Sequence, residues 1–225
     1  MLAIIKKELK SYFLSPIGYV FIGLFLTLVS LAFCFTVFLN GIIEIQYMFR
    51  PVAVMIVIII PMLTMRTFAE ERKNQTEILL FTSPRSVTSI VLAKFFAATI
   101  VLAITAVFTF MYYFILNFFG SPDITVMITS LLGVLLLGMA YTALGIFASS
   151  ITENQIIAAI VTIVFIFVAS YAPYFSKMFE PFALINVFDK FLVGVISIAN
   201  IFTYITFIAM FILLTIIFLQ RRKSR

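Results

Sequence analysis

The side chains best suited to chemistry in this sequence form one charged run, Glu70, Glu71, Arg72 and Lys73, followed by Glu77. On a helix, Glu70 and Lys73 are three residues apart and Lys73 and Glu77 are four apart, a spacing that favours ion pairs within the run. The sequence contains no histidine and one cysteine. It therefore lacks the residues for zinc sites of the usual ligand types, for Ser-His catalysis and for haem ligation by histidine. Ionic contact is the chemistry that this run can supply.

Sites for nucleotides or coupling ions are also missing from the sequence. None of the eight glycines precedes a lysine, so there is no Walker A loop to hold ATP. Ionisable residues are almost absent from the centres of the apolar segments, which leaves little for a proton relay or an ion site within a membrane. Residues for a nucleophile and a base do not converge in any of these segments, which argues against an intramembrane enzyme. Any ATP hydrolysis must take place on another chain.

The elements that must position the charged run are membrane-spanning helices. Of the 225 residues, 64% are apolar and 11% are charged, too few polar side chains to cover a surface in water. Because a bilayer core of about 30 Å takes about 20 helical residues, we expect an all-α integral membrane protein. It forms a single domain, residues 1–225, with six transmembrane helices at residues 17–39, 51–66, 90–119, 124–149, 152–172 and 200–219.

Two details of these helices concern burial. The second helix is short, with Pro51 suited to its first position. Either Arg66 extends its charge to the membrane surface, or the helix begins earlier and carries Arg50 into the bundle. Cys34 lies alone in an apolar run, so we expect a buried thiol there.

The distribution of lysine and arginine predicts the orientation, because basic residues near spans stay on the cytoplasmic side. With the N-terminus inside, twelve of the 15 basic residues are cytoplasmic, namely Lys6, Lys7, Lys10, Arg66, Arg72, Lys73, Arg85, Lys94, Arg221, Arg222, Lys223 and Arg225. The outer set is Arg50, Lys177 and Lys190. We therefore expect both termini in the cytoplasm. The net charge of +6 then reflects topology and contact with anionic membrane lipid, and no nucleic acid is needed to explain it.

Residues 1–15 have the pattern of an amphipathic helix that lies in the cytoplasmic interface. Apolar side chains recur at helical spacing, and lysines take the other face. The apolar set is Ile5, Leu9, Tyr12 and Phe13, and the basic set is Lys6, Lys7 and Lys10. Two interpretations remain open: a simple membrane anchor, or a lever that joins the first span to a cytosolic partner.

The most polar connection is the cytoplasmic loop at residues 66–89, which contains the charged run. We expect a short amphipathic helix whose charges pair with one another, while Leu79 and Leu80 offer apolar contacts. Ser83 and Pro84 break this helix, and Ser86 caps the next one. The loop is either a surface that a soluble protein pushes against or a solvated loop with cytoplasmic charges.

In the fourth span, Gly138, Thr142, Gly145 and Ser149 follow one another at offsets of four, three and four residues. This spacing places small residues on one helix face, which allows close approach of another helix in a membrane. Packing within the chain is the simplest interpretation. A subunit interface and a substrate path are the alternatives.

The extracytoplasmic segment at residues 173–199 is too apolar for a free loop, with phenylalanines at Phe175, Phe179, Phe182, Phe188 and Phe191. The spacing of Asn186 and Asp189 resembles a helix cap, and Gly194 is suited to end a helix. One or two short re-entrant or interfacial helices in the outer leaflet fit this pattern. An interfacial aromatic belt without a gating role is the alternative.

At these segments the sequence resembles the permeases of the ABC-2 exporter family, and especially their gliding-motility-type branch, over nearly its whole length. Residues 6–18 resemble the opening of that branch, in which a basic helix runs through an S-P-x-G turn into the first span. The most specific match is the inner-loop signature, at residues 68–73 and then Thr76, Glu77, Leu79, Leu80, Thr82, Ser83 and Pro84, with Lys94 and Phe95 after them. Phe188, Phe191 and Gly194 resemble the outer motif before the last span, where the branch's usual Arg and Asp are Val193 and Ser197 here.

The resemblance implies six helices per chain and a pairing of two permease chains, either two copies or two homologues. It also implies a cytosolic ATPase dimer, which binds ATP and Mg²⁺ and docks on the inner loop, while this chain itself holds no cofactor. The docking residues would be Glu70, Glu71, Arg72, Lys73, Glu77, Leu79, Leu80, Ser83 and Pro84. ATP hydrolysis on the partner would then drive export across the plasma membrane, with Phe188, Phe191 and Gly194 at the outer gate. A subunit that transmits ATPase motion to another membrane protein and moves no substrate is the alternative.

Overall fold

The computed structural model describes residues 1–77, 85–171 and 183–223. Its helices are α1 (Leu2–Leu14), α2 (Pro16–Phe33), α3 (Ile45–Thr64), α4 (Ala69–Lys73), α6 (Val87–Thr109), α7 (Met111–Leu116), α8 (Ile124–Ile151), α9 (Gln155–Tyr171), α10 (Leu184–Leu192) and α11 (Ile198–Lys223). A π-helical turn, Cys34–Leu39, extends α2. Within these ranges the chain contains no β-strand, so the all-α prediction is confirmed.

In the described part of the chain, five helical stretches are long and apolar enough to cross a membrane: Pro16–Leu39, Ile45–Lys73, Val87–Leu116, Ile124–Ile151 and Ile198–Lys223. The sixth predicted span corresponds to α9, whose apolar part, Gln155–Ser170, is shorter. Residue 172 and the first part of the predicted outer segment, residues 173–182, lie outside the described residues. The chain is thus an all-α multi-pass membrane protein with five evident spans, and a sixth span at α9 stays a prediction.

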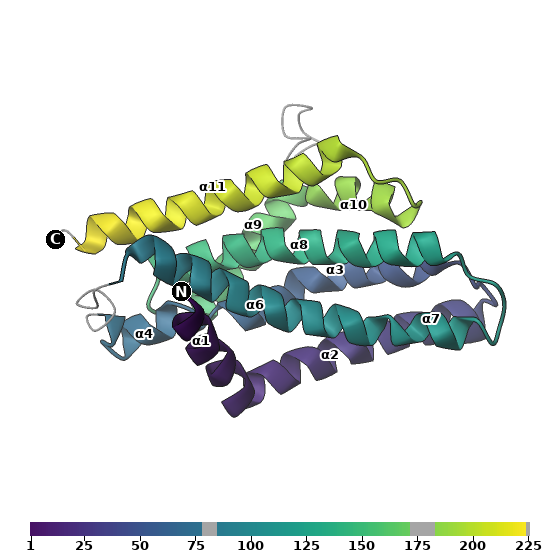
Figure 1. Cartoon of the computed structure of the whole chain (residues 1–225), viewed down its shortest axis with the longest axis horizontal. Coiled ribbons are helices and arrows are strands. Elements are labelled where there is room, and N and C mark those ends of the chain that lie inside the picture. Colours follow the sequence, from purple (N-terminus) through teal and green to yellow (C-terminus); the bar gives the residue numbers. More distant parts are fainter. Residues whose placement is uncertain (78–84, 172–182, 224–225) are drawn as a thin grey trace.

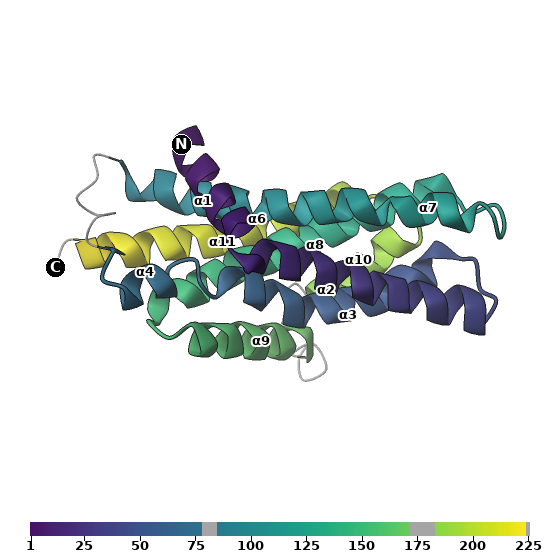
Figure 2. The same cartoon turned by 90° about the horizontal axis from the view of Figure 1, so that it is seen from below.

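The helix α8 lies at the centre of the bundle and packs against α3, α6, α9, α10 and α11 (Figures 1 and 2). Small residues permit this position. A Cβ atom on Gly138 would lie 2.3 Å from Leu102 Cδ2 of α6, and a Cβ atom on Gly145 would lie 2.1 Å from Thr64 Oγ1 of α3. Because there is little hydrophobic force between helices in lipid, such close van der Waals contact is a main source of helix association.

One end of the bundle gathers α1, α4 and the C-terminal end of α11, and the opposite end carries the connections from α2 to α3 and from α7 to α8 (Figure 1). The two termini therefore lie at the same end, with α1 running across the bundle axis while the long helices run along it (Figures 1 and 2).

Three local predictions need correction. The second span begins at Ile45, so Pro51 is inside α3 and is not its first residue. Cys34 is exposed on the helix surface and is not a buried thiol. Asn186 lies within α10, which begins at Leu184, so it is not a helix cap. In contrast, Ser86 does cap α6, since its Oγ accepts a hydrogen bond from the Ser89 N–H at 3.3 Å.

The early start of α3 leaves Arg50 within the helix but not within the bundle. Its side chain is 71% exposed and lies 3.5 Å from Asp189 of α10. Ile45, Met48 and Phe49 are buried in the same stretch, so the first turns of α3 are held by apolar contacts on one face. Tyr47 and Arg50 lie on the opposite, exposed face of the same helix.

Candidate functional site

The short helix α4 is held in place by a serine from another helix. Ser149 of α8 accepts hydrogen bonds from the backbone N–H groups of Phe68 and Ala69, each at 3.0 Å, and its hydroxyl donates to the Met65 carbonyl at 3.1 Å. A helix of five residues is too short to be stable alone, and its first N–H groups have no partners within it. Ser149 therefore acts as a cap supplied from outside, a role that the small-residue pattern in α8 did not predict.

The end of α4 is set by Gln75, which has a positive φ of 58°. The Gln75 N–H donates to the Arg72 carbonyl at 3.0 Å, and the Thr76 N–H donates to the Glu71 carbonyl at 2.9 Å. This pair of bonds is the Schellman arrangement that ends many helices. The helix therefore stops after Lys73, before the predicted break at Ser83 and Pro84, and it does not carry Lys73 and Glu77 on a common face.

The charged side chains of α4 pair outward, and the prediction that the run pairs with itself is wrong. Glu70 binds Arg66, in the connection from α3, through two hydrogen bonds of 2.5 and 2.6 Å. Glu71 lies 2.8 Å from Lys94 of α6. In the described ranges Lys73 has no ion-pair partner, and its side chain is exposed. We refer to Glu70, Glu71, Arg72 and Glu77 as the α4 cluster.

The other two members of the α4 cluster reach the far helices. Arg72 donates from Nη1 to the carbonyl of Ile151, the last residue of α8, at 2.8 Å, and its Nε lies 2.7 Å from Glu153 Oε1. Glu77 accepts a hydrogen bond of 3.0 Å from Nη1 of Arg222, near the end of α11. The α4 cluster thus connects one short segment to α6, to the junction of α8 and α9, and to α11.

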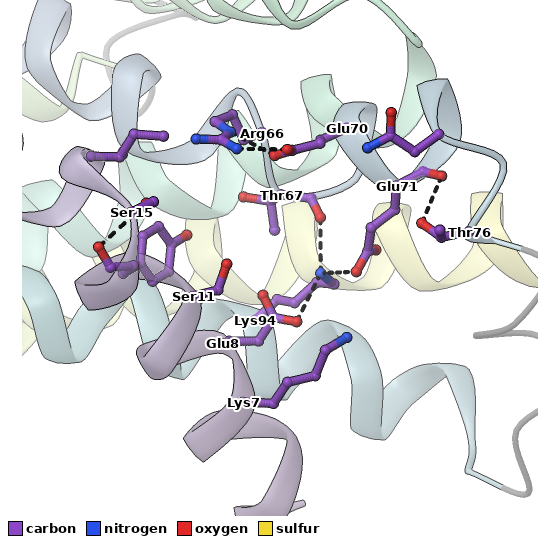
Figure 3. Close-up of a pocket in the computed structure, with 13 residues that line it drawn as sticks. Lys7, Glu8, Ser11, Ser15, Arg66, Thr67, Glu70, Glu71, Thr76 and Lys94 are labelled. Atoms are coloured by element: carbon purple, nitrogen blue, oxygen red, sulfur yellow. Dashed lines mark hydrogen bonds and ion pairs between the residues drawn. The ribbon is translucent and has the colours of Figure 1, made fainter.

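Lys94 is the most buried charge of this region, with a side chain that is 1% exposed. Its Nζ donates to Glu71 Oε1 at 2.8 Å, to the Thr67 carbonyl at 2.9 Å and to Glu8 Oε1 of α1 at 3.2 Å (Figure 3). The ammonium group also lies 5.1 Å from the centroid of the Phe68 ring. Burial of a charge is costly unless partners compensate for the lost water, and here three oxygen atoms do so.

A pocket of about 520 Å³ opens between α1 and α4, beside Lys94 (Figure 3). Glu8, Ser11 and Tyr12 line it from α1, and Glu70 and Glu71 line it from α4. The Tyr12 hydroxyl donates to the Leu63 carbonyl of α3 at 3.3 Å. Burial raises the pKa of the Tyr12 phenol well above its usual range, so this group remains a neutral donor.

The structure places the predicted interfacial helix as α1. Lys6, Lys7 and Lys10 are exposed on it, whereas Tyr12 and Phe13 are partly buried against the bundle. Four of the predicted docking residues, Leu79, Leu80, Ser83 and Pro84, lie outside the described residues.

The small-residue set of α8 is spread along one side of the helix, where Gly138, Thr142, Gly145 and Ser149 are all buried. Two of its members contact other helices of the same chain as described above, and Ser149 caps α4. Thr142 Oγ1 is buried without a hydrogen-bond partner among the described residues.

The predicted outer residues belong to α10 and its end. Phe188 and Phe191 are fully buried, and a Cβ atom on Gly133 of α8 would lie 2.8 Å from Phe191 Cβ and 3.0 Å from Phe188 Cδ2. Gly194 has a φ of 81° and ends α10, as its spacing predicted. A second pocket, of about 480 Å³, lies at this end between the α2–α3 connection, the start of α8 and the end of α10.

Lys94 was counted among the cytoplasmic lysines and in the inner-loop signature, but its bond to Glu8 and the capping role of Ser149 were not predicted. The sequence does indicate that Lys94 needs polar partners, because it is a single lysine within an otherwise apolar stretch of α6. The sequence does not indicate which residues those partners are, because Glu8 and Glu71 are 86 and 23 residues away along the chain.

The sequence was compared with models of known protein families. The sequence profile described as ABC-2 family transporter protein matches residues 43–220, from just before α3 to near the end of α11. A search of curated proteins gives no significant match.

Proposed function

Because the chain belongs to the ABC-2 family of transporter proteins, we propose that it is the permease subunit of an exporter driven by ATP hydrolysis on a separate cytosolic subunit. The family match over residues 43–220 is the observation that carries this proposal. Members of the family are membrane subunits that generally lack an ATPase site of their own. In this proposal ATP and Mg²⁺ bind the partner, and this chain supplies the path through the plasma membrane.

The α4 segment offers two faces that suit this role. The residues of the α4 cluster are engaged with other parts of the bundle, whereas Lys73, Asn74, Gln75 and Thr76 at the end of the helix are exposed. A partner that contacts this exposed turn would act on a segment already tied to α6, α8 and α11 through the α4 cluster. We therefore place the ATPase contact on residues 73–76, and the α4 cluster serves to pass the motion on and not to grip the partner.

Co-purification tests this placement. The chain is co-expressed with a candidate ATP-binding-cassette subunit, and the pair is isolated in detergent with and without the substitutions Lys73→Glu and Asn74→Trp, made together. We expect the ATPase to be lost while the unfolding temperature of the chain stays unchanged, because both side chains are exposed. Lys190→Glu, an exposed lysine on α10 at the other end of the bundle, is the matched control and should keep the ATPase bound. Full ATPase binding by the doubly substituted chain would remove residues 73–76 from the contact.

Export itself is tested with reconstituted vesicles that contain the chain and its ATPase. We expect ATP-dependent movement of fluorescent phospholipids or of an amphipathic cationic dye across the vesicle membrane. The alternative, a subunit that assists assembly of another membrane protein, predicts ATP hydrolysis without flux of either probe. A second permease chain, a copy or a homologue, completes the transporter in this proposal, and both termini face the cytoplasm with α4.

A further inference from the structure

Lys94 of α6 joins α1 and α4, two helices that both border the same pocket. Its three oxygen partners belong to Glu8 on α1, to Glu71 on α4 and to Thr67 in the turn before α4. Between α1 and α4 lies the pocket of about 520 Å³, so the two helices are separated there by open space. The ammonium group of Lys94 bridges that separation from the side of α6 (Figure 3).

Both carboxylates that contact Lys94 depend on its positive charge. Two carboxylates, Glu8 and Glu71, share one ammonium group, and their side chains are 12% and 17% exposed. Each carboxylate is therefore mostly removed from water and depends on the same cation. A movement that draws either helix away from Lys94 leaves a poorly solvated carboxylate behind.

The helix α1 is also well placed to pass a movement on to α2. Only Ser15 separates the end of α1 from the start of α2. At this bend the two helices pack closely, because a Cβ atom on Gly18 would lie only 2.7 Å from the Tyr12 carbonyl oxygen. A single linking residue and this close approach leave α1 little freedom to turn without moving the first turn of α2.

We propose that Lys94 is a positioning residue that couples α1 to α4, so that a displacement of α4 also moves α1 and the first turn of α2. The inference rests on the proposed function in one respect, since the bound ATPase supplies the displacement. Lys94 and Glu8 thereby take part in transmitting motion from α4 to α1. Neither the exposed end of α4 nor the family match assigns them this role.

Distance measurements in the complete complex test the coupling. The exposed Cys34 is replaced by alanine, and spin labels are attached to cysteines at Lys10 on α1 and Lys223 at the end of α11, both exposed. We expect the distance between the labels to differ between the nucleotide-free complex and the complex trapped with ATP and vanadate. In Glu8→Ala this difference should vanish, because Lys94 keeps Glu71 and the Thr67 carbonyl while α1 loses its ion pair with Lys94 and keeps its contacts with α2, α3 and α6.

Three further variants separate coupling from folding. Glu8→Ala leaves a neutral Lys94–Glu71 pair, so the chain should fold and bind the ATPase normally. Lys94→Arg retains a cation between both carboxylates and should keep the nucleotide-dependent change, whereas Lys94→Met should abolish it. Lys6→Ala on the exposed face of α1 is the matched control and should behave as the parent chain. The flux per ATP hydrolysed should fall about fivefold or more in Glu8→Ala, the size of a typical loss of coupling.

The outcomes distinguish the two proposals. If no ATPase binds the parent chain, the proposed function fails. If the ATPase binds and the nucleotide-dependent distance change persists in Glu8→Ala and Lys94→Met, the role of Lys94 is overturned while the proposed function stands. An unchanged distance in the parent complex in both nucleotide states would equally overturn the coupling.

Discussion

Two short helices sit at opposite ends of this bundle, and they are held by different forces. At one end, α4 is fixed by Ser149 and by ion pairs from the α4 cluster to several other parts of the chain. At the other end, α10 rests on the fully buried rings of Phe188 and Phe191. Its ion pair between Arg50 and Asp189 is largely exposed, at 71% and 40%.

The difference matters for how each end can move. Ion pairs and hydrogen bonds depend on direction, so a small displacement of α4 strains defined bonds to α6, α8 and α11. Apolar contact depends on buried area and much less on direction, and α10 is held mainly in this way. One directional bond adds to it, since the Tyr204 hydroxyl of α11 donates to the Leu184 carbonyl at 2.9 Å. The α4 end, with several ion pairs to different helices, is therefore better suited to transmit motion than the α10 end.

The largest effect is expected when the packing of α10 is broken. Phe188→Ala should destabilise the protein by about 3–5 kcal/mol, because it leaves a cavity where a fully buried ring now packs. Thermal unfolding in detergent measures this loss. Phe118→Ala, on an exposed ring at the same end of the bundle, is the control and should change the unfolding temperature little. Equal losses of stability in the two variants would contradict the conclusion that the buried rings of α10 hold it in place.

A somewhat smaller effect is expected when the shared cation is removed. Lys94→Met should cost about 2 kcal/mol or more, because Glu8 and Glu71 lose their partner, although the nearby pocket gives them some access to water. Chemical unfolding in detergent measures the change. Adding Glu71→Gln to Lys94→Met should recover part of the stability, since one of the two unpaired charges disappears. Without that recovery, the loss in Lys94→Met would come from packing and not from charge.

The loss of the cap on α4 is expected to be smaller again. Ser149→Ala removes one acceptor for two backbone N–H groups and should cost about 1 kcal/mol. Hydrogen exchange should become faster at the amides of Phe68 and Ala69 before it changes elsewhere in the bundle. Ser150→Ala is a close control, because within the described residues the Ser150 Oγ bonds only to the Phe147 carbonyl of its own helix. Equal exchange in both variants would show that α4 is held by its ion pairs alone.

The smallest effect is expected at the exposed ion pair of the α10 end. Arg50→Ala should change the unfolding free energy by less than about 1 kcal/mol, because exposed pairs are screened by water and salt. The comparison is made at low and high salt, and the parent chain and variant should agree closely at high salt. A loss that approaches that of Phe188→Ala would mean that both ends of the bundle depend on charge.

The long helices could be predicted well from the sequence, because the thickness of the bilayer sets their length and apolar character. Apolar runs of the required length give the spans Pro16–Leu39, Val87–Leu116, Ile124–Ile151 and Ile198–Lys223 within a few residues, and Ser86 marks the start of α6 correctly. The start of α3 was left open, because Pro51 suits a first helical position and Gln46 and Arg50 interrupt the apolar run. The buried positions Ile45, Met48 and Phe49 show instead that a helical stripe was present in that stretch.

The candidate site was only partly predictable. Its location in the loop at residues 66–89 follows from charge, but its pairing does not, because helical spacing compares a residue only with its own helix. Arg222 binds Glu77 from 145 residues away, and the serine that caps α4 comes from about 80 residues further along the chain. Such partners are fixed by tertiary packing, which no local pattern contains.

The bend between α1 and α2 depends on the absence of a side chain at one position. At Gly18 the Tyr12 carbonyl oxygen lies 2.7 Å from the place that a Cβ atom would take, so any larger residue there must push the two helices apart. The angle at which the interfacial helix enters the first span is therefore set by a single hydrogen atom, and Gly18→Ala is expected to widen it.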